Sequence, residues 1–502
     1  MNSKFVMDIE YSTIQELGFG LGSGAVSSVE LVEHFLKKIA GEDECFNAIA
    51  FRNPNAADIA SQLDHERRKG YVRGPLHGIP LLIKDNIDTA DGMMTSAGSL
   101  ALDGSMAVKD AHLVSLLRQA GAVILGKTNL SEWANFRSTR SSSGWSSRGG
   151  QVRNAYATDR TPGGSSSGSG VAVARGFCAG AIGTETDGSI VGPSAMNSIV
   201  GIKPTVGLVS RSGIIPISHS QDTAGPMART VADAAIILAA IAGPDRNDIA
   251  TAAQGSERNG GNLSLMSKNA LKGQRIGVVR NFAGFHEGVD AQFENALALI
   301  RAEGAEIVDD ISLADPTTIR KHEIIVMRTE FKVGLNRYLS KLPSSAKIHS
   351  LAELIAFNEK HRDKVMPYFE QEQLLAAEMT CGLDDCKYKT ALVVSQKLTR
   401  DEGIDKVLTS YKCSALVAPT SSAPWAIDLI NGDNRIGGSS CLAAVSGYPS
   451  VTVPMGYVAG LPVGISFTAK AWQDKHVIDL AYAFERAGEF RSNPGPPARF
   501  LS

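Results

Sequence analysis

Two serines and their surroundings are the first candidates for chemistry. The segment from Gly163 to Ile190 reads GGSSSGSGVAVARGFCAGAIGTETDGSI and places Ser165 and Ser189 in two separate Gly/Ser clusters. A flexible linker would stay polar, whereas the middle of this segment is small and apolar and therefore suits burial. The second half could present consecutive backbone N–H groups beside Ser189, and such a set stabilises an oxyanion. Ser189 is thus a candidate nucleophile; the alternative is a Gly/Ser turn inside a buried sheet.

A nucleophilic serine needs a base, and no histidine lies near either serine in the sequence. A lysine can serve when burial among apolar groups lowers its pKa. Lys84 ends the apolar run IPLLIK, which reads as a central strand. In such a strand the stem of Lys84 is packed, and Asp85 points to the opposite face. The alternative is a lysine in solvent at the end of a strand, which is the commonest environment of lysine.

Several motifs together resemble the amidase signature family. The resemblance is dense from Gly74 to about Gly243 and continues weakly to LVAPT and GYPSVTVPMG near the C-terminus. Its specificity comes from the combination of GPLHGIPLLIKDNID, AGAVILGKTNLSEWA, TPGGSSSGSGVAVARG, GTETDGSIVGPSAMNSIVGIKPTVGLVSRSGIIP and DTAGPMARTVADAA.

The resemblance implies a Ser–cisSer–Lys triad. In this sequence the lysine of the KDN motif is Lys84, the bridging serine is Ser165, and the nucleophile is Ser189, which lies 189 − 165 = 24 residues further on. The expected oxyanion hole consists of backbone N–H groups around Thr186, Asp187, Gly188 and Ser189. The implied enzyme is an amidohydrolase that acts on linear amides through an acyl-enzyme and needs no metal or organic cofactor.

One departure from the family pattern bears on the substrate. Many members carry Arg two residues after the nucleophile, where this chain has Val191. Without that cation, a small acidic substrate and a role as the glutaminase component of an amidotransferase complex are disfavoured. The TETDGSIV, SEWANFRS and SGWSSRGGQVRN versions resemble bacterial peptide amidases, which release ammonia from C-terminal peptide amides. An aryl-acylamide or broad aliphatic amide hydrolase remains the alternative.

Composition gives the class of protein. The chain has 502 residues, of which 43% are hydrophobic and 20% are charged, and a formal net charge of −2. These values are typical of a globular protein and favour neither a nucleic-acid partner nor an anionic membrane surface. Six scattered cysteines and ten histidines form no disulfide framework or metal-ligand pattern. We expect a small-molecule or peptide amide as substrate and no obligatory protein partner. The N-terminus lacks a signal peptide, which predicts a cytoplasmic protein, although a processed exported form stays open.

Alternating helical and strand patterns predict an α/β architecture, and the resemblance specifies a central mixed β-sheet covered by α-helices on both sides. We expect one domain over residues 1–502. It comprises a helical region at 1–70, a catalytic core at 72–245, and a divergent helical region at about 316–405 that shapes the substrate pocket. A composition break at Gly255–Gly261 marks a linker or a surface loop.

Individual elements follow from periodicity and capping residues. Ser27 or Ser28 is expected to cap a helix that ends near residue 40. Further helices are expected at 55–70, 109–121 and 231–243, strands at 79–83, 122–128, 414–420 and 449–455, and a polar loop at 137–150. Trp145 in that loop could line a substrate cleft or simply pack beneath it.

One motif is misleading. Gly121 to Thr128, GAVILGKT, matches the phosphate-binding P-loop pattern. A P-loop needs a strand, then a loop, then a helix. Here a predicted helix precedes Gly121, and the four residues between the glycines read as a strand. We interpret the match as chance and expect no nucleotide binding.

Overall fold

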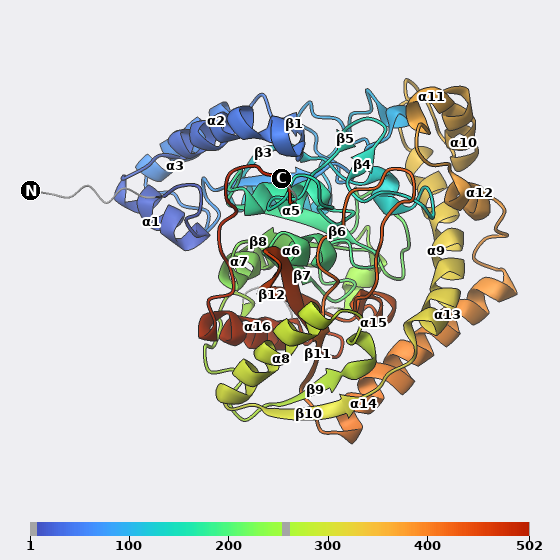
Figure 1. The fold of residues 1–502 in the computed structure, drawn as a ribbon. Helices are drawn as coiled ribbons and strands as arrows, with labels where there is room; N and C mark the ends of the chain where they lie inside the picture. Colours follow the sequence, from blue (N-terminus) through green and yellow to red (C-terminus); the bar gives the residue numbers. More distant parts are fainter. Residues whose placement is uncertain (1–7, 254–261, 501–502) are drawn as a thin grey trace, which may run out of the picture.

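The computed structural model describes residues 8–253 and 262–500, so the composition break at 255–261 lies outside the described residues. Its centre is a mixed sheet of 11 strands in the order β1-β3-β2-β6-β8-β7-β12-β13-β11-β9-β10 (Figure 1). β2 runs parallel to both β3 and β6, whereas β6, β8, β7, β12 and β13 follow one another antiparallel. The predicted fold class, a mixed sheet with helices on both sides, is confirmed.

The strands of the main sheet are β1 Ile49–Arg52, β2 Pro80–Lys84, β3 Val123–Thr128, β6 Gly180–Glu185, β7 Val200–Lys203, β8 Thr223–Ala228, β9 Arg275–Val279, β10 Glu306–Ile311, β11 Ala415–Pro419, β12 Ser450–Val458 and β13 Leu461–Thr468. A separate two-stranded sheet pairs β4 Trp145–Ser146 with β5 Gly150–Gln151.

The helices of the first half are α1 Ile14–Ser23, α2 Ser28–Phe46, α3 Ala56–Arg68, α4 His112–Gln119, α5 Ser167–Ala174, α6 Val191–Met196 and α7 Val231–Ile241. Those of the second half are α8 Glu287–Ala302, α9 Pro316–Leu339, α10 Leu351–Lys360, α11 Arg362–Val365, α12 Glu372–Glu378, α13 Cys386–Thr399, α14 Asp405–Ser410, α15 Ser440–Ser446 and α16 Asp474–Ala487.

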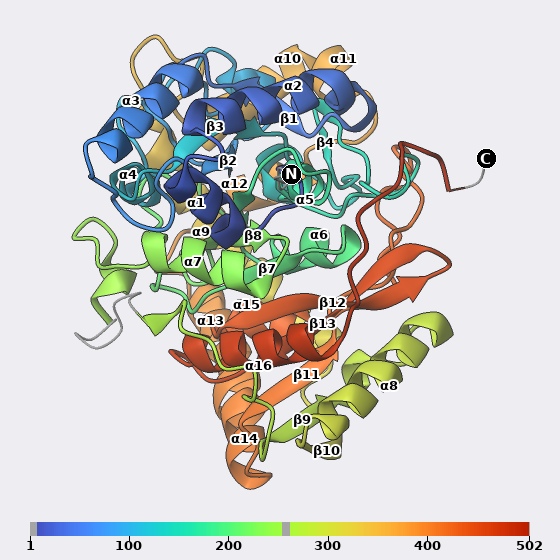
Figure 2. The same ribbon diagram turned by 90° about the vertical axis from the view of Figure 1, so that its left-hand side faces the viewer.

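The sheet separates two hydrophobic cores, one on each face. In β2, Leu81 and Ile83 join the core that contains residues of α4, α7, α8 and α16. Leu82 joins the second core, with residues of α2, α3 and α5. Successive side chains of a strand point to opposite faces, so neighbours in β2 belong to different cores. Figures 1 and 2 show the two layers of helices with the sheet between them.

Most elements expected from the sequence are present. Ser27 caps α2, because its Oγ accepts a hydrogen bond from the Glu30 N–H at 3.2 Å. The predicted helices at 55–70, 109–121 and 231–243 correspond to α3, α4 and α7. The predicted strands correspond to β2, β3, β11 and β12. The P-loop-like motif therefore contains strand β3, as expected.

Two expectations need correction. The first 70 residues are not entirely helical, because β1 adds an edge strand that pairs antiparallel with β3. Only four residues long and half-exposed, it shows no clear apolar alternation in the sequence. The segment 137–150 is also not entirely loop, because Trp145 and Ser146 form β4 and Gly150 begins β5. A strand of two residues is too short for periodicity to detect.

The helical segment α9 to α13 lies along one side of the molecule (Figure 1). Phe331 and Leu335 of α9 share a core cluster with Trp133, which precedes β4, and Ile215, which precedes β8. α9 also lies beside the loop before β8, because Glu323 and Glu330 accept hydrogen bonds from residues of that loop.

Gly168 in α5 tests how closely this helix packs against the backbone at Ala48 and Asn129. A Cβ at this position would lie 2.2 Å from the Ala48 carbonyl oxygen and 2.5 Å from that of Asn129. We expect Gly168→Ala to lower the free energy of unfolding by about 1–3 kcal/mol, because backbone atoms must move. Urea unfolding measures this change. In the control Gly41→Ala, in α2, the new Cβ meets nothing within 4 Å. This variant should be up to about 1 kcal/mol more stable. Equal stabilities of the two variants would contradict the packing described.

Candidate active site

Lys84 is the last residue of β2, and its side chain is fully buried on the α5 side of the sheet. The alternation of the strand places it on the same face as Leu82. There its Nζ lies 2.8 Å from the Oγ of Ser165 and 2.9 Å from the Oγ of Ser166. Thr184, in β6, adds its hydroxyl at 2.9 Å and its carbonyl oxygen at 3.2 Å. The amine is thus surrounded by hydroxyls rather than carboxylates.

Burial lowers the pKa of Lys84 to about 7, and the more distant charges of Glu185 and Asp222 only partly oppose this shift. The neighbouring carboxylate of Asp85 does not offset it, because that side chain points to the other face. There it accepts a hydrogen bond from Ser96 and lies 3.8 Å from the Nζ of Lys127. A substantial fraction of Lys84 is therefore neutral near pH 7, and a neutral amine has a lone pair that can accept a proton.

Ser165 and Ser189 come from segments that meet in front of Lys84. Ser165 follows a cis peptide bond from Gly164 and is fully buried before the start of α5. The Ser166 N–H donates to the Ser189 carbonyl oxygen at 3.1 Å. The two segments are therefore joined by a backbone hydrogen bond, while the Ser165 hydroxyl contacts Lys84.

The turn between β6 and α6 presents Ser189. Gly188 has a φ of +78°, which a residue with a side chain adopts only with strain. The Glu185 carboxylate accepts hydrogen bonds from the N–H groups of Ile190 at 2.7 Å and Val191 at 3.0 Å. These bonds hold the end of the turn, and Ser189 remains 7% exposed.

This turn borders a cavity of about 220 Å³. The predicted oxyanion-hole residues Thr186, Asp187, Gly188 and Ser189 all line it, as do Gly164 and Val191. The structure thus brings the residues expected from the sequence to one place, with Lys84 and Ser165 buried beneath the turn.

Other walls of the cavity were not predicted. Arg320 and Met327 of α9 line it, together with Trp425, Asp433 and Arg435 from the loop before α15. Trp145, the aromatic residue considered from the sequence, instead packs on Arg137, Tyr368 and Phe369. The only feature of this loop in the sequence is its Gly- and charge-rich composition, NGDNRIGG. Such a composition is common in surface loops and therefore does not identify a cavity wall.

Comparisons with known proteins identify the family. The family model for amidases matches residues 30–478 of this chain. The chain belongs to the amidase family.

The structure of this amidase superposes on that of the native peptide amidase from Stenotrophomonas maltophilia with a TM-score of 0.92 and 47% sequence identity, covering 96% of this chain and 98% of that one. A probable amidase of Arabidopsis thaliana is 40% identical over 97% of this chain and 92% of its own length. A glutamyl-tRNA(Gln) amidotransferase component of Symbiobacterium thermophilum is 34% identical, over 92% and 94%. The protein is an amidohydrolase of C–N bonds other than peptide bonds.

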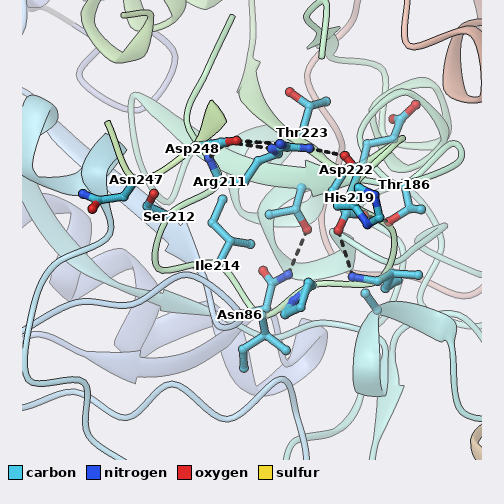
Figure 3. Close-up of a pocket in the computed structure, with 16 residues that line it drawn as sticks. Asn86, Thr186, Arg211, Ser212, Ile214, His219, Asp222, Thr223, Asn247 and Asp248 are labelled. Atoms are coloured by element: carbon cyan, nitrogen blue, oxygen red, sulfur yellow. Dashed lines mark hydrogen bonds and ion pairs between the residues drawn. The ribbon is translucent and has the colours of Figure 1, made fainter. Parts of the chain in front are cut away.

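A second cavity of the amidase, of about 170 Å³, has Thr184, Glu185 and Thr186 in its wall, the residues that lead into the same turn (Figure 3). Asn86 and the ion pair of Arg211 and Asp248 also line it. The Asn86 Nδ2 donates to the Thr184 hydroxyl at 3.0 Å, so this cavity approaches the surroundings of Lys84.

Two further properties concern the residues that the structure covers. Over 8–253 and 262–500, the amidase has no group of three His, Cys, Asp or Glu side chains placed to hold a metal ion. No helix within these same ranges is long and apolar enough to cross a membrane.

The low pKa of Lys84 predicts a pH-dependent stability. In the unfolded chain the pKa of lysine is about 10.4, so between pH 7 and 10 the unfolded state holds a proton that the folded state lacks. The free energy of unfolding of the parent should therefore rise with pH relative to Lys84→Met, by up to about 1.4 kcal/mol per pH unit. Urea unfolding at pH 7, 8 and 9 measures the difference. The exposed Lys321→Met is the control and should show no such slope; a pH-independent difference for Lys84→Met would contradict the buried neutral amine.

Proposed function

We propose that this amidase hydrolyses the C-terminal amide of peptides with release of ammonia, using Ser189 as nucleophile, Ser165 as proton relay and Lys84 as base. The contact that carries the proposal is the 2.8 Å distance between the fully buried Lys84 amine and the Ser165 hydroxyl. A hydroxyl in contact with a neutral amine can transfer its proton to it, and it can then accept one from a second hydroxyl.

The proton and electron balance of the reaction follows from these roles. Neutral Lys84 accepts a proton from Ser165, Ser165 accepts one from Ser189, and the Ser189 Oγ bonds to the amide carbon. The carbonyl oxygen becomes an oxyanion, which the backbone N–H groups of the turn around Thr186, Asp187, Gly188 and Ser189 stabilise. Ser165 gives its proton to the nitrogen as the C–N bond breaks, and Lys84 returns a proton to Ser165. Water then attacks the acyl-enzyme and gives a proton to the same relay, which passes a proton to the Ser189 Oγ as the acyl–oxygen bond breaks and the acid is released.

The substrate class is supported by the walls of the cavity and by the relatives. Val191 lines the cavity where many family members carry Arg, and the two arginines of the cavity wall contact residues of the protein. Arg320 lies 3.8 Å from the Asp187 carboxylate, and Arg435 donates to the Ser440 hydroxyl at 2.9 Å. The Stenotrophomonas maltophilia enzyme is named a peptide amidase and covers nearly the whole chain. The amidotransferase component has lower identity, and a glutaminase role remains the less favoured alternative. Aryl or aliphatic acylamides are the other candidates for the same cavity.

The triad makes a first prediction. Ser189→Ala and Lys84→Ala should each lower kcat by at least about 10⁴-fold, because nucleophile and base are lost. Ser165→Ala should lower it by about 10²- to 10⁴-fold, the usual contribution of a proton-transfer group. Ser395→Ala is a matched control: this buried serine of α13 donates its hydroxyl to the Leu392 carbonyl of the same helix at 3.1 Å and lines neither cavity. Near-parental kcat is expected for the control, whereas near-parental kcat for Ser189→Ala would disprove the nucleophile.

The pH profile makes a second prediction. Since Lys84 has a pKa of about 7, the neutral base rises from about a tenth of the enzyme at pH 6 to about nine tenths at pH 8. Activity on an uncharged peptide amide should increase accordingly and level off at higher pH with respect to this group. A rate that is flat from pH 5 to 8 would exclude a neutral lysine base.

The substrate proposal is tested by ammonia and amine release from a peptide amide, the same peptide with a free carboxyl end, its anilide, and glutamine. We expect ammonia release from the peptide amide, with a kcat/KM at least about tenfold higher than for the other compounds. Faster cleavage of the anilide would favour an aryl-acylamide hydrolase. Glutamine turnover that requires a partner protein would overturn the proposal.

A further inference from the structure

Gln221 contacts the turn that carries the proposed oxyanion hole, from the side away from the cavity. It is 2% exposed and precedes β8. Its Nε2 donates hydrogen bonds to the Thr186 carbonyl oxygen at 3.2 Å and to Glu323 Oε1 at 2.9 Å. Neither Gln221 nor Glu323 lines the cavity, so both act on the turn from behind.

The hydrogen bond to Thr186 determines the orientation of one peptide group. The Thr186–Asp187 peptide bond is trans, and in a trans peptide the C=O and N–H bonds point in opposite directions. Because Gln221 holds the Thr186 carbonyl on the buried side, the Asp187 N–H points to the other side, where Thr186, Asp187 and Ser189 border the cavity. If this peptide group rotated, a carbonyl oxygen would face the oxyanion and repel it.

The segment that carries Gln221 is itself fixed around the turn. Asp222 accepts a hydrogen bond from the Thr186 hydroxyl at 2.5 Å and others from backbone N–H groups of its own loop. On α9, the Glu330 carboxylate accepts hydrogen bonds from the hydroxyls of Ser218 at 2.6 Å and Ser220 at 3.0 Å. The amide of Gln221 is therefore held between the turn and helix α9.

Burial favours the neutral form of Glu323. Burial and the nearby Asp187 raise the pKa of Glu323 to about 8, and the hydrogen bond from Gln221 and the charges of Arg320 and Arg435 only partly oppose this shift. Arg320 lies 3.8 Å from the Asp187 carboxylate, and the Cys441 thiol also faces this cluster. A neutral carboxyl can accept the hydrogen bond from Gln221 without adding negative charge beside a developing oxyanion.

We propose that Gln221, held in place by Glu323 of α9, is a positioning residue that keeps the Asp187 N–H directed at the oxyanion. This inference rests on the proposed roles of Ser189 and the turn, and assigns their support to two residues that touch neither substrate nor nucleophile.

Kinetics of Gln221→Leu test the proposal. Removing one oxyanion donor typically lowers kcat by 10²- to 10³-fold. Because Gln221→Leu loosens this donor without removing it, we expect kcat to fall by at least about 30-fold and KM to change by less than about threefold. The matched control is Gln371→Leu, which removes a buried amide that bonds Asn358 and the Ile355 carbonyl of α10 and lines neither cavity. Unchanged kcat for Gln221→Leu, or an equal loss for the control, would overturn the proposal.

A transition-state mimic separates positioning from general damage. A peptide aldehyde adds to a serine hydroxyl and forms a tetrahedral adduct with an oxyanion, whereas a peptide amide bound to Ser189→Ala forms none. Gln221→Leu should weaken inhibition by the aldehyde by at least about 30-fold. In the Ser189→Ala background, it should change the Kd of the peptide amide by less than about threefold. Equal weakening of both ligands would indicate a damaged cavity and contradict a positioning role.

Glu323 is tested through pH. The parent should lose activity above about pH 8, when ionisation of Glu323 places a second negative charge beside Asp187. Glu323→Gln, a neutral isostere that can still accept the hydrogen bond, should keep kcat within about threefold at pH 7 and lose this alkaline decline. Glu323→Leu should lower kcat by at least about tenfold both at pH 7 and above pH 8. A decline that persists in Glu323→Gln would contradict the assignment.

The same experiments distinguish failure of this inference from failure of the proposed function. If Ser189→Ala is inactive while Gln221→Leu retains parental kcat and aldehyde binding, the nucleophile stands and the positioning role falls. If Ser189→Ala retains activity, the proposed function itself fails, whatever Gln221→Leu does.

Discussion

A buried lysine without a carboxylate partner is the constraint on which the rest of this structure depends. An amine that must be neutral near pH 7 has to be removed from water and kept away from counter-ions, because either would restore its charge. Lys84 meets both conditions at the end of a central strand, where its polar contacts are the hydroxyls of Ser165, Ser166 and Thr184 and one carbonyl oxygen. The sheet thus provides the low-dielectric site and the hydroxyl of Thr184, and the segment before α5 provides the two serine hydroxyls.

The other half of the site depends on long-range contacts. The Thr186 carbonyl accepts a hydrogen bond from Gln221 in the loop before β8, and the Ser189 carbonyl accepts one from the Ser166 N–H. The proposed oxyanion hole depends on such contacts, because the N–H groups of the turn face the cavity only if its carbonyls are held elsewhere. Two buried acids on one face of α9, Glu323 and Glu330, reach the loop before β8. Helix α9 also supplies Arg320 and Met327 to the cavity wall. A change in this helix can therefore alter both the cavity wall and the geometry of the proposed oxyanion hole.

Features of the site that depend on residues close together in the sequence could be predicted, and those that depend on distant residues could not. Lys84, Ser165 and Ser189 lie in short motifs whose residue types and spacing are themselves informative, and the strands around them are long apolar runs. Trp425 and Asp433 line the cavity from a loop that lies more than 200 residues after Ser189 in the sequence. The local composition of that loop does not indicate that it folds against Ser189. Gln221 was missed for the same reason, because its two partners lie 35 and 102 residues away in sequence. The edge strand β1 escaped because it is short and only half-buried.

The register of β2 has a consequence for how this enzyme can vary. Lys84 and Asp85 are adjacent in sequence, yet one contacts serine hydroxyls on the α5 face and the other contacts Ser96 and Lys127 on the opposite face. The pairing of β2 with β3 also shifts between Leu81 and Leu82, so the strand contains an irregularity before it reaches Lys84. Loss of one residue beyond that point would bring the carboxylate of Asp85 to Ser165 in place of the amine, and gain of one would bring an apolar residue there. The length of the strand from this irregularity to Lys84 therefore constrains the proposed base as strictly as the identity of the residue does.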